Sequence, residues 1–403
     1  PFEFRYKNIW REGDKNINSY VYPQYPMEKI MDTMRPIYEK AVADAKAADT
    51  PEKRRGVGIA WGGFNVTEGG GDSAEVALEL MPGNKIRKYD TWHAMGQGAT
   101  TGSLVVTLEA LKEMHLTPED IQLIQNDTKT CPDTGMAGAS RSLYMDGNAT
   151  IIAANKLLAA MRKEDGTLRT YDEMKAEGIE TKYLGRYETN TTPGLCRLDP
   201  NTGIGDPTPA FTYCLNLAEV EVDTKTGKTT VLKFTCVDFV GRIGNIDAVN
   251  GQAYSGIMHG IGFALKEDYA DVKKHANMFG AGTSYIKDVP DDINLIHIDG
   301  AISDGPFGSS GASEAFQASG HCAVLNGIYN ACGVRIHEIP ALPEKVKAGL
   351  DAIAKGEKPY EPKKYFLGSD MYEELENIKE NPVQVGTQSF YVSLDDPTAE
   401  RPF

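Results

Sequence analysis

The segment TYCLNLAEVEVDTKTGKTTVLKFTCVDFV, residues 212–240, constrains the fold more than any other part of the sequence. Apolar and polar residues alternate in two runs on either side of the turn Lys225-Thr226-Gly227. Alternation with a period of two predicts strands, and a short turn that contains glycine joins such strands into an antiparallel hairpin. The fold therefore contains antiparallel pairing and is not a uniformly parallel sheet.

Helical and extended segments follow one another in mixed order along the chain. Apolar residues spaced three and four positions apart predict a helix at residues 26–49. Further helices are expected at 143–163, 250–269 and 315–333. Strands are expected at 54–66, 120–127 and 292–301, together with a second hairpin in 68–92 that turns at Pro82-Gly83-Asn84. We predict the α+β fold class, with mixed sheets and packed helices.

The chain has 403 residues, enough for two or three domains or subdomains. We expect residues 1–26 to be an extended arm and the polar segment 164–210 to be a connection or insertion. The predicted divisions are 1–55 (arm and first helix), 56–210 (an α/β subdomain), 211–346 (a second α/β subdomain) and 347–403 (a tail).

Composition excludes some classes of partner. The chain carries 42 Lys and Arg against 57 Asp and Glu, a net charge of -15, so nucleic acid is not expected as a partner. No apolar run is long enough to span a membrane, and the first residues contain no apolar signal core. Six unclustered cysteines suggest reduced thiols and a cytoplasmic protein.

Three loops of small residues each precede an expected helix, at 95–102, 133–141 and 304–313. Helix N-termini offer unpaired N–H groups, and small residues let the backbone approach a phosphate closely. The glycines at 96, 98 and 102 miss the spacing of the dinucleotide fingerprint, and no P-loop follows. Each loop alone is more often a tight turn, but three together favour a large phosphate-bearing cofactor. Arg141 could contact a phosphate or form an ordinary salt bridge.

Glu314 is the one carboxylate in the stretch GSSGASEAF. A carboxylate among small apolar neighbours is suited to act as a general base. The ordinary alternative is an acid in the first turn of a helix, where it interacts with the helix dipole. Local sequence alone favours this alternative. Serine hydrolase and His-Glu-x-x-His zinc motifs do not occur.

Four segments in order resemble a known family: TWHAMGQGATTGSLVVTLEAL (91–111), NDTKTCPDTGMAGASRSLYMDGNAT (126–150), NGQAYSGIMHGIGFALKED (250–268) and DGPFGSSGASEAF (304–316). Together they resemble the C-terminal, molybdenum-cofactor-binding part of the xanthine oxidase family of molybdenum hydroxylases. The bacterial molybdenum aldehyde oxidoreductases are the most similar members. The resemblance extends from residue 4 to residue 346 and does not cover the tail.

The resemblance implies roles for individual residues. Glu314 matches the catalytic glutamate, and Gln97 matches a glutamine that contacts the pterin and approaches the metal. The cofactor-binding set is Gly96, Gln97, Gly98, Ala99, Ala137, Gly138, Ala139, Ser140, Arg141, Ser142, Gln252, Ser309, Ser310, Gly311, Ala312 and Ser313. The implied cofactor is molybdopterin cytosine dinucleotide, with tungsten as an alternative to molybdenum. The pterin dithiolene holds the metal, so no protein side chain is expected as a metal ligand.

The implied reaction oxidises an aldehyde to a carboxylic acid, with Glu314 as base for a metal-bound hydroxyl. Electrons leave to [2Fe–2S] clusters on a partner chain or a region outside this chain. The implied partners are the other half of the molybdenum region and an iron–sulfur subunit, in an oligomeric assembly. Met95 stands where a His is usual, and Ala315-Phe316-Gln317 also departs from the family pattern. An N-heterocyclic substrate, or a non-catalytic cofactor-binding subunit, therefore stays open.

Overall fold

The computed structural model describes residues 1–357 except 23, 68–70, 126, 190–197, 207, 272 and 303, and also residues 380–381. Residues 1–359 form one compact unit. Most of the expected tail at 347–403 therefore lies outside the described residues, and its first part completes a helix that ends at Ala354.

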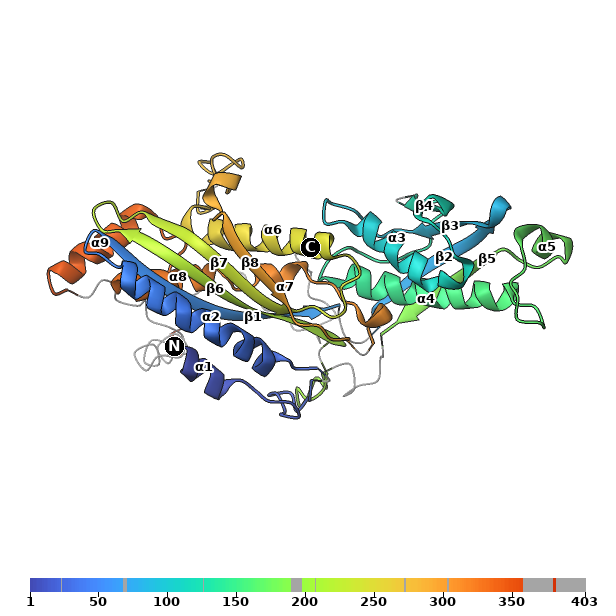
Figure 1. Cartoon of the computed structure of the whole chain (residues 1–403), viewed down its shortest axis with the longest axis horizontal. Coiled ribbons are helices and arrows are strands. Elements are labelled where there is room, and N and C mark those ends of the chain that lie inside the picture. The colour runs from blue at the N-terminus through green and yellow to red at the C-terminus, as the bar shows by residue number, and fades with distance from the viewer. Residues whose placement is uncertain are drawn as a thin grey trace. The chain divides into compact units, whose positions relative to one another are not determined.

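A first sheet of four strands forms one half of this unit (Figure 1). Its strands, in spatial order, are β1 (Lys53–Val66), β6 (Ala210–Asp223), β7 (Thr229–Phe239) and β8 (Asp292–His297). The predicted hairpin at 212–240 is confirmed, since β6 and β7 pair antiparallel. β1 pairs antiparallel with β6 along its whole length, and β8 lies parallel to β7.

The two faces of the first sheet bury different helices because side chains alternate along each strand. Val57 and Ile59 of β1 lie in the apolar cluster that contains α2 (Met27–Ala48). Gly56 and Gly58 face the opposite side, where α8 (Gly320–Cys332) packs on the strand. A Cβ at Gly58 would lie 2.1 Å from the carbonyl oxygen of Ala323, so glycine is required for this close contact.

The second sheet also has four strands, in the order β4 (Ile121–Gln125), β3 (Lys85–Asp90), β2 (Ser73–Met81) and β5 (Lys182–Glu188). β2 and β3 form the predicted hairpin at Pro82-Gly83-Asn84. β3 and β4 are parallel, and α3 (Ala99–Ala110) lies in the connection between them. α4 (Arg141–Met161) packs on β2 and β5.

The remaining helices complete the first half of the unit and the turn before β5. They are α1 (Phe2–Asn8), α5 (Tyr171–Ala176), α6 (Ile246–Leu265), α7 (Ser313–Gln317) and α9 (Pro343–Ala354). α6 packs against α7 and α8. Among the described residues, no helix is long and apolar enough to cross a membrane. The five described cysteines are all free.

The predicted α+β class is confirmed, but four local expectations are wrong. The expected arm contains α1, because Phe2 packs in the core beside α2. The expected connection at 164–210 contains α5 and β5, which closes an edge of the second sheet. The expected helix at 315–333 is two helices, α7 and α8, which separate at residues 318–319.

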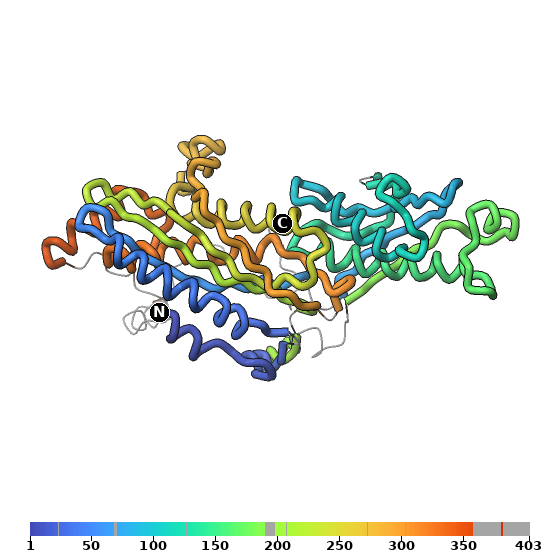
Figure 2. Tube along the Cα trace, viewed as in Figure 1, coloured from blue at the N-terminus to red at the C-terminus, as the bar shows by residue number. Residues whose placement is uncertain are grey.

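The fourth correction concerns where the second sheet lies in the chain. The division at residue 56 assigned β1 to the same subdomain as β2, whereas β1 pairs with β6. The trace in Figure 2 shows that the chain leaves the first sheet after β1 and returns to it at β6. The second sheet is thus an insertion between two paired strands, and two chain crossings join the halves.

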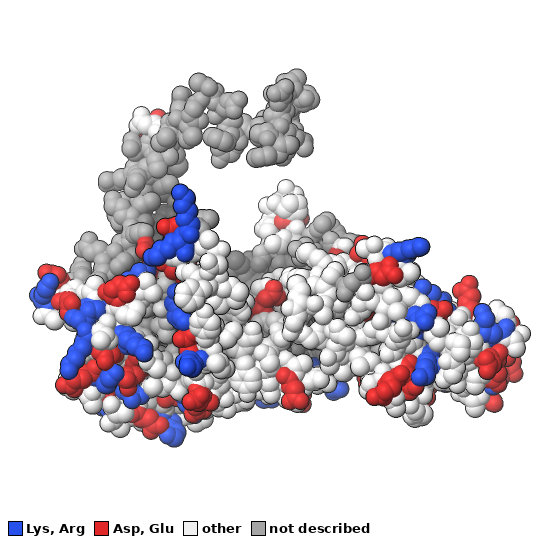
Figure 3. Space-filling view, turned by 90° about the horizontal axis from the view of Figure 1, so that it is seen from above, with Lys and Arg blue, Asp and Glu red and all other residues white. Residues whose placement is uncertain are grey.

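Charged side chains of both signs occur together on the surface. On the face shown in Figure 3, they gather over the two ends, and few lie on the stretch between them. Basic side chains on this face stand beside acidic ones and form no continuous positive area. On this face, positive charge for a ligand would therefore come from individual residues and not from a basic patch.

Candidate functional site

A cavity of about 600 Å³ lies where helices from both halves begin. The residues just before α3, α4 and α6 are Gly98, Ser140 and Asn245, and all three line it. Fourteen predicted site residues line this cavity: Gln97, Gly98, Ala99, Ala137, Gly138, Ser140, Ser142, Gln252, Ser309, Ser310, Gly311, Ala312, Ser313 and Glu314. The structure therefore brings together loops that are far apart in the sequence.

The helix ends at the cavity can attract negative charge. The first N–H groups of a helix have no partner within the helix, and the helix dipole places partial positive charge there. Gly98 has no side chain that could cap α3, and the Ser140 hydroxyl does not cap α4, whereas the Asn245 side chain accepts a 2.9 Å hydrogen bond from the Ala248 N–H. Side chains thus cap only one of these three helix ends. At α4 the Arg141 N–H donates to the Gly138 carbonyl oxygen over 3.1 Å, and the N–H groups that follow it can bind a ligand.

Two loops from different halves touch at the cavity wall. A Cβ at Gly311 would lie 1.9 Å from the carbonyl oxygen of Ser140, so only glycine allows this approach. Ala139 and Ser140 both have φ of 50°, in the left-handed region that non-glycine residues seldom adopt. Beside them, the Ser310 hydroxyl is buried and has no hydrogen-bond partner among the described residues. Ser310 as a residue lines the cavity, but neighbouring atoms cover its hydroxyl oxygen.

Glu314 lies in the first turn of α7 and lines the cavity. Its Oε2 accepts a hydrogen bond from the Ser140 hydroxyl. Next to it, the Ser313 hydroxyl donates to Gln252 Oε1 over 2.9 Å. Gln252 Nε2 in turn donates to the Gln97 carbonyl oxygen over 3.3 Å. The predicted catalytic and cofactor-binding residues thus form one connected group, and Glu314 combines a helix-start position with exposure to the cavity.

The side-chain amide of Gln97 forms hydrogen bonds within the loop that contains it. Its Nε2 donates to the His93 carbonyl oxygen over 2.7 Å, and its Oε1 accepts from the Met95 N–H over 2.5 Å. Gly96 just before it does not line the cavity. In this arrangement Gln97 presents its backbone to the cavity wall, and its amide holds the loop between β3 and α3.

Arg141 does not face the cavity, contrary to the idea that it contacts a phosphate. Its side chain is buried, with 3% exposed, and pairs with both carboxylate oxygens of Asp72 at 2.7 Å. It also donates to the carbonyl oxygens of Ser73, Thr134 and Met136. The carboxylate of Asp72 compensates its charge, and neither Arg141 nor the neighbouring Ala139 belongs to the cavity lining. Arg141 instead braces the loop before α4.

Arg242 is a site residue that the sequence did not reveal. Among the cavity-lining residues it is the only Lys or Arg, and no ion pair is found for it among the described residues. Its N–H donates to the Gly308 carbonyl oxygen over 2.8 Å, which places it beside the Glu314 loop. A usable signal existed: GRIGN follows a strand and ends in a helix N-cap, Asn245.

The two places where the sequence departs from the family pattern lie in different surroundings. Ala315 and Phe316 belong to α7, are fully buried and do not line the cavity, and Phe316 packs in the apolar core. Met95, the other departure from the family pattern, is 74% exposed and lines the cavity. Among the described residues, no group of three or more His, Cys, Asp or Glu could hold a metal.

Comparison with known proteins agrees with this geometry. Residues 34–290 match the family described as molybdopterin cofactor-binding domain. The chain belongs to this family. The match covers most of both sheets and the starts of α3, α4 and α6.

Relatives of this molybdopterin-binding chain include named oxidoreductases. It is 39% identical over 352 residues to an aldehyde oxidoreductase of Megalodesulfovibrio gigas, covering 87% of the chain and 38% of the relative. It is 28% identical over 277 residues to a probable hypoxanthine oxidase of Escherichia coli K12, covering 65% of the chain and 29% of the relative. The chain therefore spans well under half the length of these proteins.

Solved structures confirm the fold. The aldehyde oxidoreductase of Desulfovibrio desulfuricans ATCC 27774 matches with a TM-score of 0.82 and 42% identity, over 86% of this chain and 38% of that one. The predicted resemblance to aldehyde oxidoreductases and the xanthine oxidase family is therefore confirmed for this chain.

Proposed function

We propose that this chain is the cofactor-binding catalytic part of a molybdenum hydroxylase that oxidises an aldehyde to a carboxylic acid. The observation that carries the proposal is the single cavity in which Glu314 meets the starts of three helices. The 39% identity to a protein named aldehyde oxidoreductase favours an aldehyde as substrate.

The residues at the cavity fit a large pterin cofactor with phosphate groups. The uncapped starts of α3 and α4 and the guanidinium of Arg242 offer the positive charge that phosphates need. Small residues from Ser309 to Ser313 leave room for the ring system. We propose the cytosine dinucleotide form with molybdenum, with tungsten as the alternative metal.

The chain's own residues would position the substrate and move a proton. When bound, the cofactor supplies the redox chemistry by accepting the two electrons of the oxidation. Ser140 holds Glu314 by one carboxylate oxygen, Oε2, which leaves Oε1 to accept a proton in the cavity. Gln252 and Ser313 keep this loop against the loop of Gln97. Glu314 thus acts as a general base with a fixed orientation.

The chain spans 38% of the length of its aldehyde oxidoreductase relative, so other polypeptide must complete the enzyme. We propose that the other half of the molybdenum region closes the cavity, and that [2Fe–2S] clusters on an iron–sulfur subunit or region carry the electrons away. The assembly is oligomeric and works in the cytoplasm. No step requires nucleic acid or a membrane.

An N-heterocyclic substrate is the second candidate. It is favoured by the relative named probable hypoxanthine oxidase and by Met95, an apolar side chain at the cavity where a His is usual. Turnover of the native complex on a panel of aldehydes and purines separates the two. Activity confined to purines would refute the aldehyde proposal.

Glu314→Gln tests the role of the base. We expect turnover to fall roughly 10²- to 10⁴-fold while cofactor content stays unchanged, since the amide keeps the shape but cannot accept the proton. Glu109→Gln is the matched control, because Glu109 also lines the cavity but pairs with Lys112 at the surface. Normal turnover in Glu314→Gln would favour a non-catalytic subunit. Absence of pterin and of both metals from the native complex would refute the whole proposal.

A further inference from the structure

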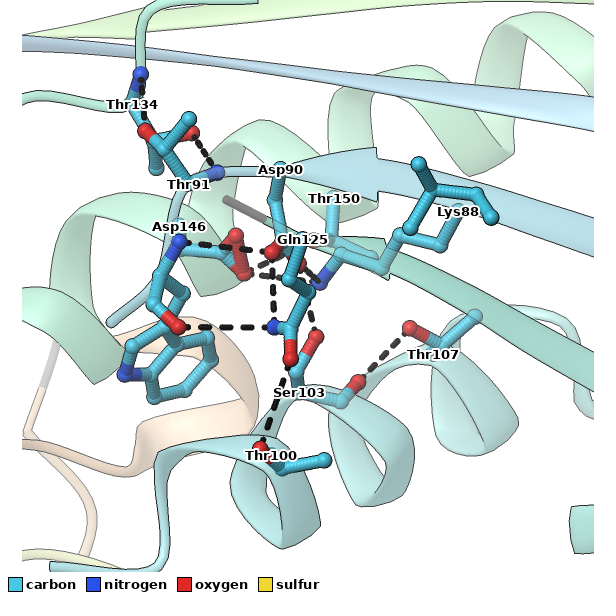
Figure 4. Close-up of polar contacts among 12 residues, drawn as sticks. Lys88, Asp90, Thr91, Thr100, Ser103, Thr107, Gln125, Thr134, Asp146 and Thr150 are labelled. Carbon is cyan, nitrogen blue, oxygen red and sulfur yellow. Dashed lines mark hydrogen bonds and ion pairs between the residues drawn. The ribbon is translucent and has the colours of Figure 1, made fainter. Parts of the chain in front are cut away.

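Three charged side chains are fully buried where β3 and α4 meet, and Figure 4 shows their contacts. Lys88 of β3 contacts Asp146 of α4 at 2.7 Å and Asp90 of β3 at 3.3 Å. All three side chains have no exposed surface. None of them lines the cavity, and the proposed reaction makes no use of them.

Asp90 connects this group to the start of α3. Its Oδ2 accepts a 2.8 Å hydrogen bond from the hydroxyl of Ser103, little more than one turn after the Gly98 that begins α3 (Figure 4). Its Oδ1 accepts from Gln125 Nε2 at 2.7 Å and from the Trp92 N–H at 3.3 Å. Since Trp92 and Gly98 both line the cavity, Asp90 fixes the strand end and the helix start on one side of it.

Asp146 connects the same group to the start of α4. It lies in the second turn after Ser140, the residue that holds Glu314. Its Oδ1 contacts Lys88 and the hydroxyl of Thr150, which is 3.3 Å away. Its Oδ2 has no hydrogen-bond partner among the described residues. Lys88 is therefore the link between α4 and the strand that carries Asp90.

A contribution to folding stability does not by itself explain why three charged side chains are buried together. Removing three charges from water is unfavourable, and well-packed apolar residues in place of a buried ion pair are often neutral or stabilising. Ionic contacts do differ from apolar ones in one respect, because they are satisfied only in one relative position of their partners. The partners here are the two helices whose uncapped starts form the cavity wall.

We propose that Lys88, Asp90 and Asp146 are positioning residues that hold the starts of α3 and α4 at the separation the cofactor requires. This inference rests on the proposed cofactor-binding function. It predicts that the group governs how firmly the cofactor is held, separately from how stably the chain folds. Second-layer contacts around metal sites alter affinity roughly 10- to 100-fold, which sets the size of effect to expect.

The test is a neutral triple variant, Lys88→Met with Asp90→Asn and Asp146→Leu, in the native complex. We expect its melting temperature to stay close to that of the wild type, while the cofactor dissociates at least roughly tenfold faster. Pterin released per polypeptide over time measures this without reference to activity. A triple variant that melts normally and keeps its cofactor as long as the wild type would overturn the proposal.

Leu157→Ala is the control for general destabilisation. Leu157 is buried in α4 against the second sheet but lies outside the cavity lining. This variant should melt at a lower temperature and still release its cofactor at the wild-type rate. If it releases cofactor as fast as the triple variant, the effect is one of stability and the proposal fails.

Ser103→Ala covers the case in which the triple variant does not fold. It removes only the hydrogen bond from α3 to Asp90, so we expect a smaller, severalfold faster release with a nearly unchanged melting temperature. Unchanged release in this variant would count against the proposal. If the wild-type complex holds no pterin at all, the proposed function fails first, and the two failures are distinguished.

Discussion

The two halves that border the cavity hold their helices by different means. On the side of the second sheet, α3 and α4 are joined through the buried charges of Lys88, Asp90 and Asp146. On the side of the first sheet, α6 and α7 touch through backbone at Gly256, where a Cβ would lie 2.6 Å from that of Phe316. The first contact depends on charge and on the direction of hydrogen bonds, and the second depends on the small size of glycine.

A buried carboxylate on the first-sheet side, Asp238, provides a direct comparison with the group around Lys88. Asp238 of β7 pairs with His297 Nδ1 at 2.9 Å, and His297 Nε2 lies 2.8 Å from Asn250 at the start of α6. This arrangement has one acid and one base, whereas the other side places two acids around one lysine. Loss of Lys88 should therefore be the most damaging single change on either side.

Lys88→Met should have the largest effect. It leaves two buried carboxylates without a cation, and breaking a buried pair in this way costs about 3–5 kcal/mol of unfolding free energy. Urea denaturation measures the loss. Lys85→Met is the control on the same strand, because Lys85 is 57% exposed and should change stability by less than about 0.5 kcal/mol. Equal stabilities for the two variants would show that the buried charges are not coupled.

Gly256→Ala should have the next largest effect. The added methyl group meets Phe316 at 2.6 Å, and crowding of this kind costs about 1–3 kcal/mol. Gly251→Ala on the same helix has no atom within 4 Å of the new Cβ, so it should stabilise by about 0.5–1 kcal/mol. The two substitutions are chemically identical. The same sign of change for both would refute the idea that close packing holds α6 to α7.

The features that could be predicted from the sequence are those determined by residues close together in the chain. The hairpin at 212–240 and the small-residue loops were predictable because alternation and glycine spacing are local signals. The role of Arg141 was not, because its partner Asp72 lies 69 residues away. Arg242 was missed although GRIGN offered a local signal, because its place at the cavity depends on Gly308 in another loop. The membership of β1 in the first sheet depends on pairing with β6 across the whole inserted sheet.

Glu314 shows what the family resemblance added. Local sequence favoured an ordinary acid at the start of a helix, and the structure does place Glu314 in the first turn of α7. Its contact with Ser140, from the other half of the unit, cannot be read from either loop alone. The resemblance placed both loops at one cofactor, and the common cavity agrees with that placement.

The third prediction concerns the pH dependence of stability, and it involves only the second-sheet side with its buried charges. Burial raises the pKa of Asp146 from 3.8 to about 7, with Asp90 adding to the rise and Lys88 opposing it. The folded state therefore binds a proton that the unfolded state has released. The resulting stability is complete below pH 3.8 and is lost as pH rises to about 7, by up to about 1.4 kcal/mol per pH unit.

Asp146→Asn removes this titration. Urea denaturation of both proteins between pH 5 and pH 8 should show that the stability of the wild type relative to the variant falls as pH rises to about 7 and then stays constant. Because all other groups are shared, the difference isolates Asp146. Parallel pH profiles would contradict the predicted pKa shift, and Gly256→Ala should leave the profile unchanged.

The smallest effect on stability is expected for Arg242→Gln. Arg242 is exposed at the cavity and has no ion pair among the described residues, so unfolding free energy should change by less than about 0.5 kcal/mol. Its loss removes the only Lys or Arg found at the cavity among the described residues, so the cofactor should dissociate faster, and its release should depend less steeply on added salt because one screened ion pair is gone. Arg141→Gln should do the reverse, since Arg141 braces a loop: stability falls, and the salt dependence of release is unchanged. If cofactor release from Arg242→Gln shows the wild-type dependence on salt, Arg242 does not bind the phosphates, and the helix ends alone bind them. The two sides of the cavity would then differ in charge only through the buried group around Lys88.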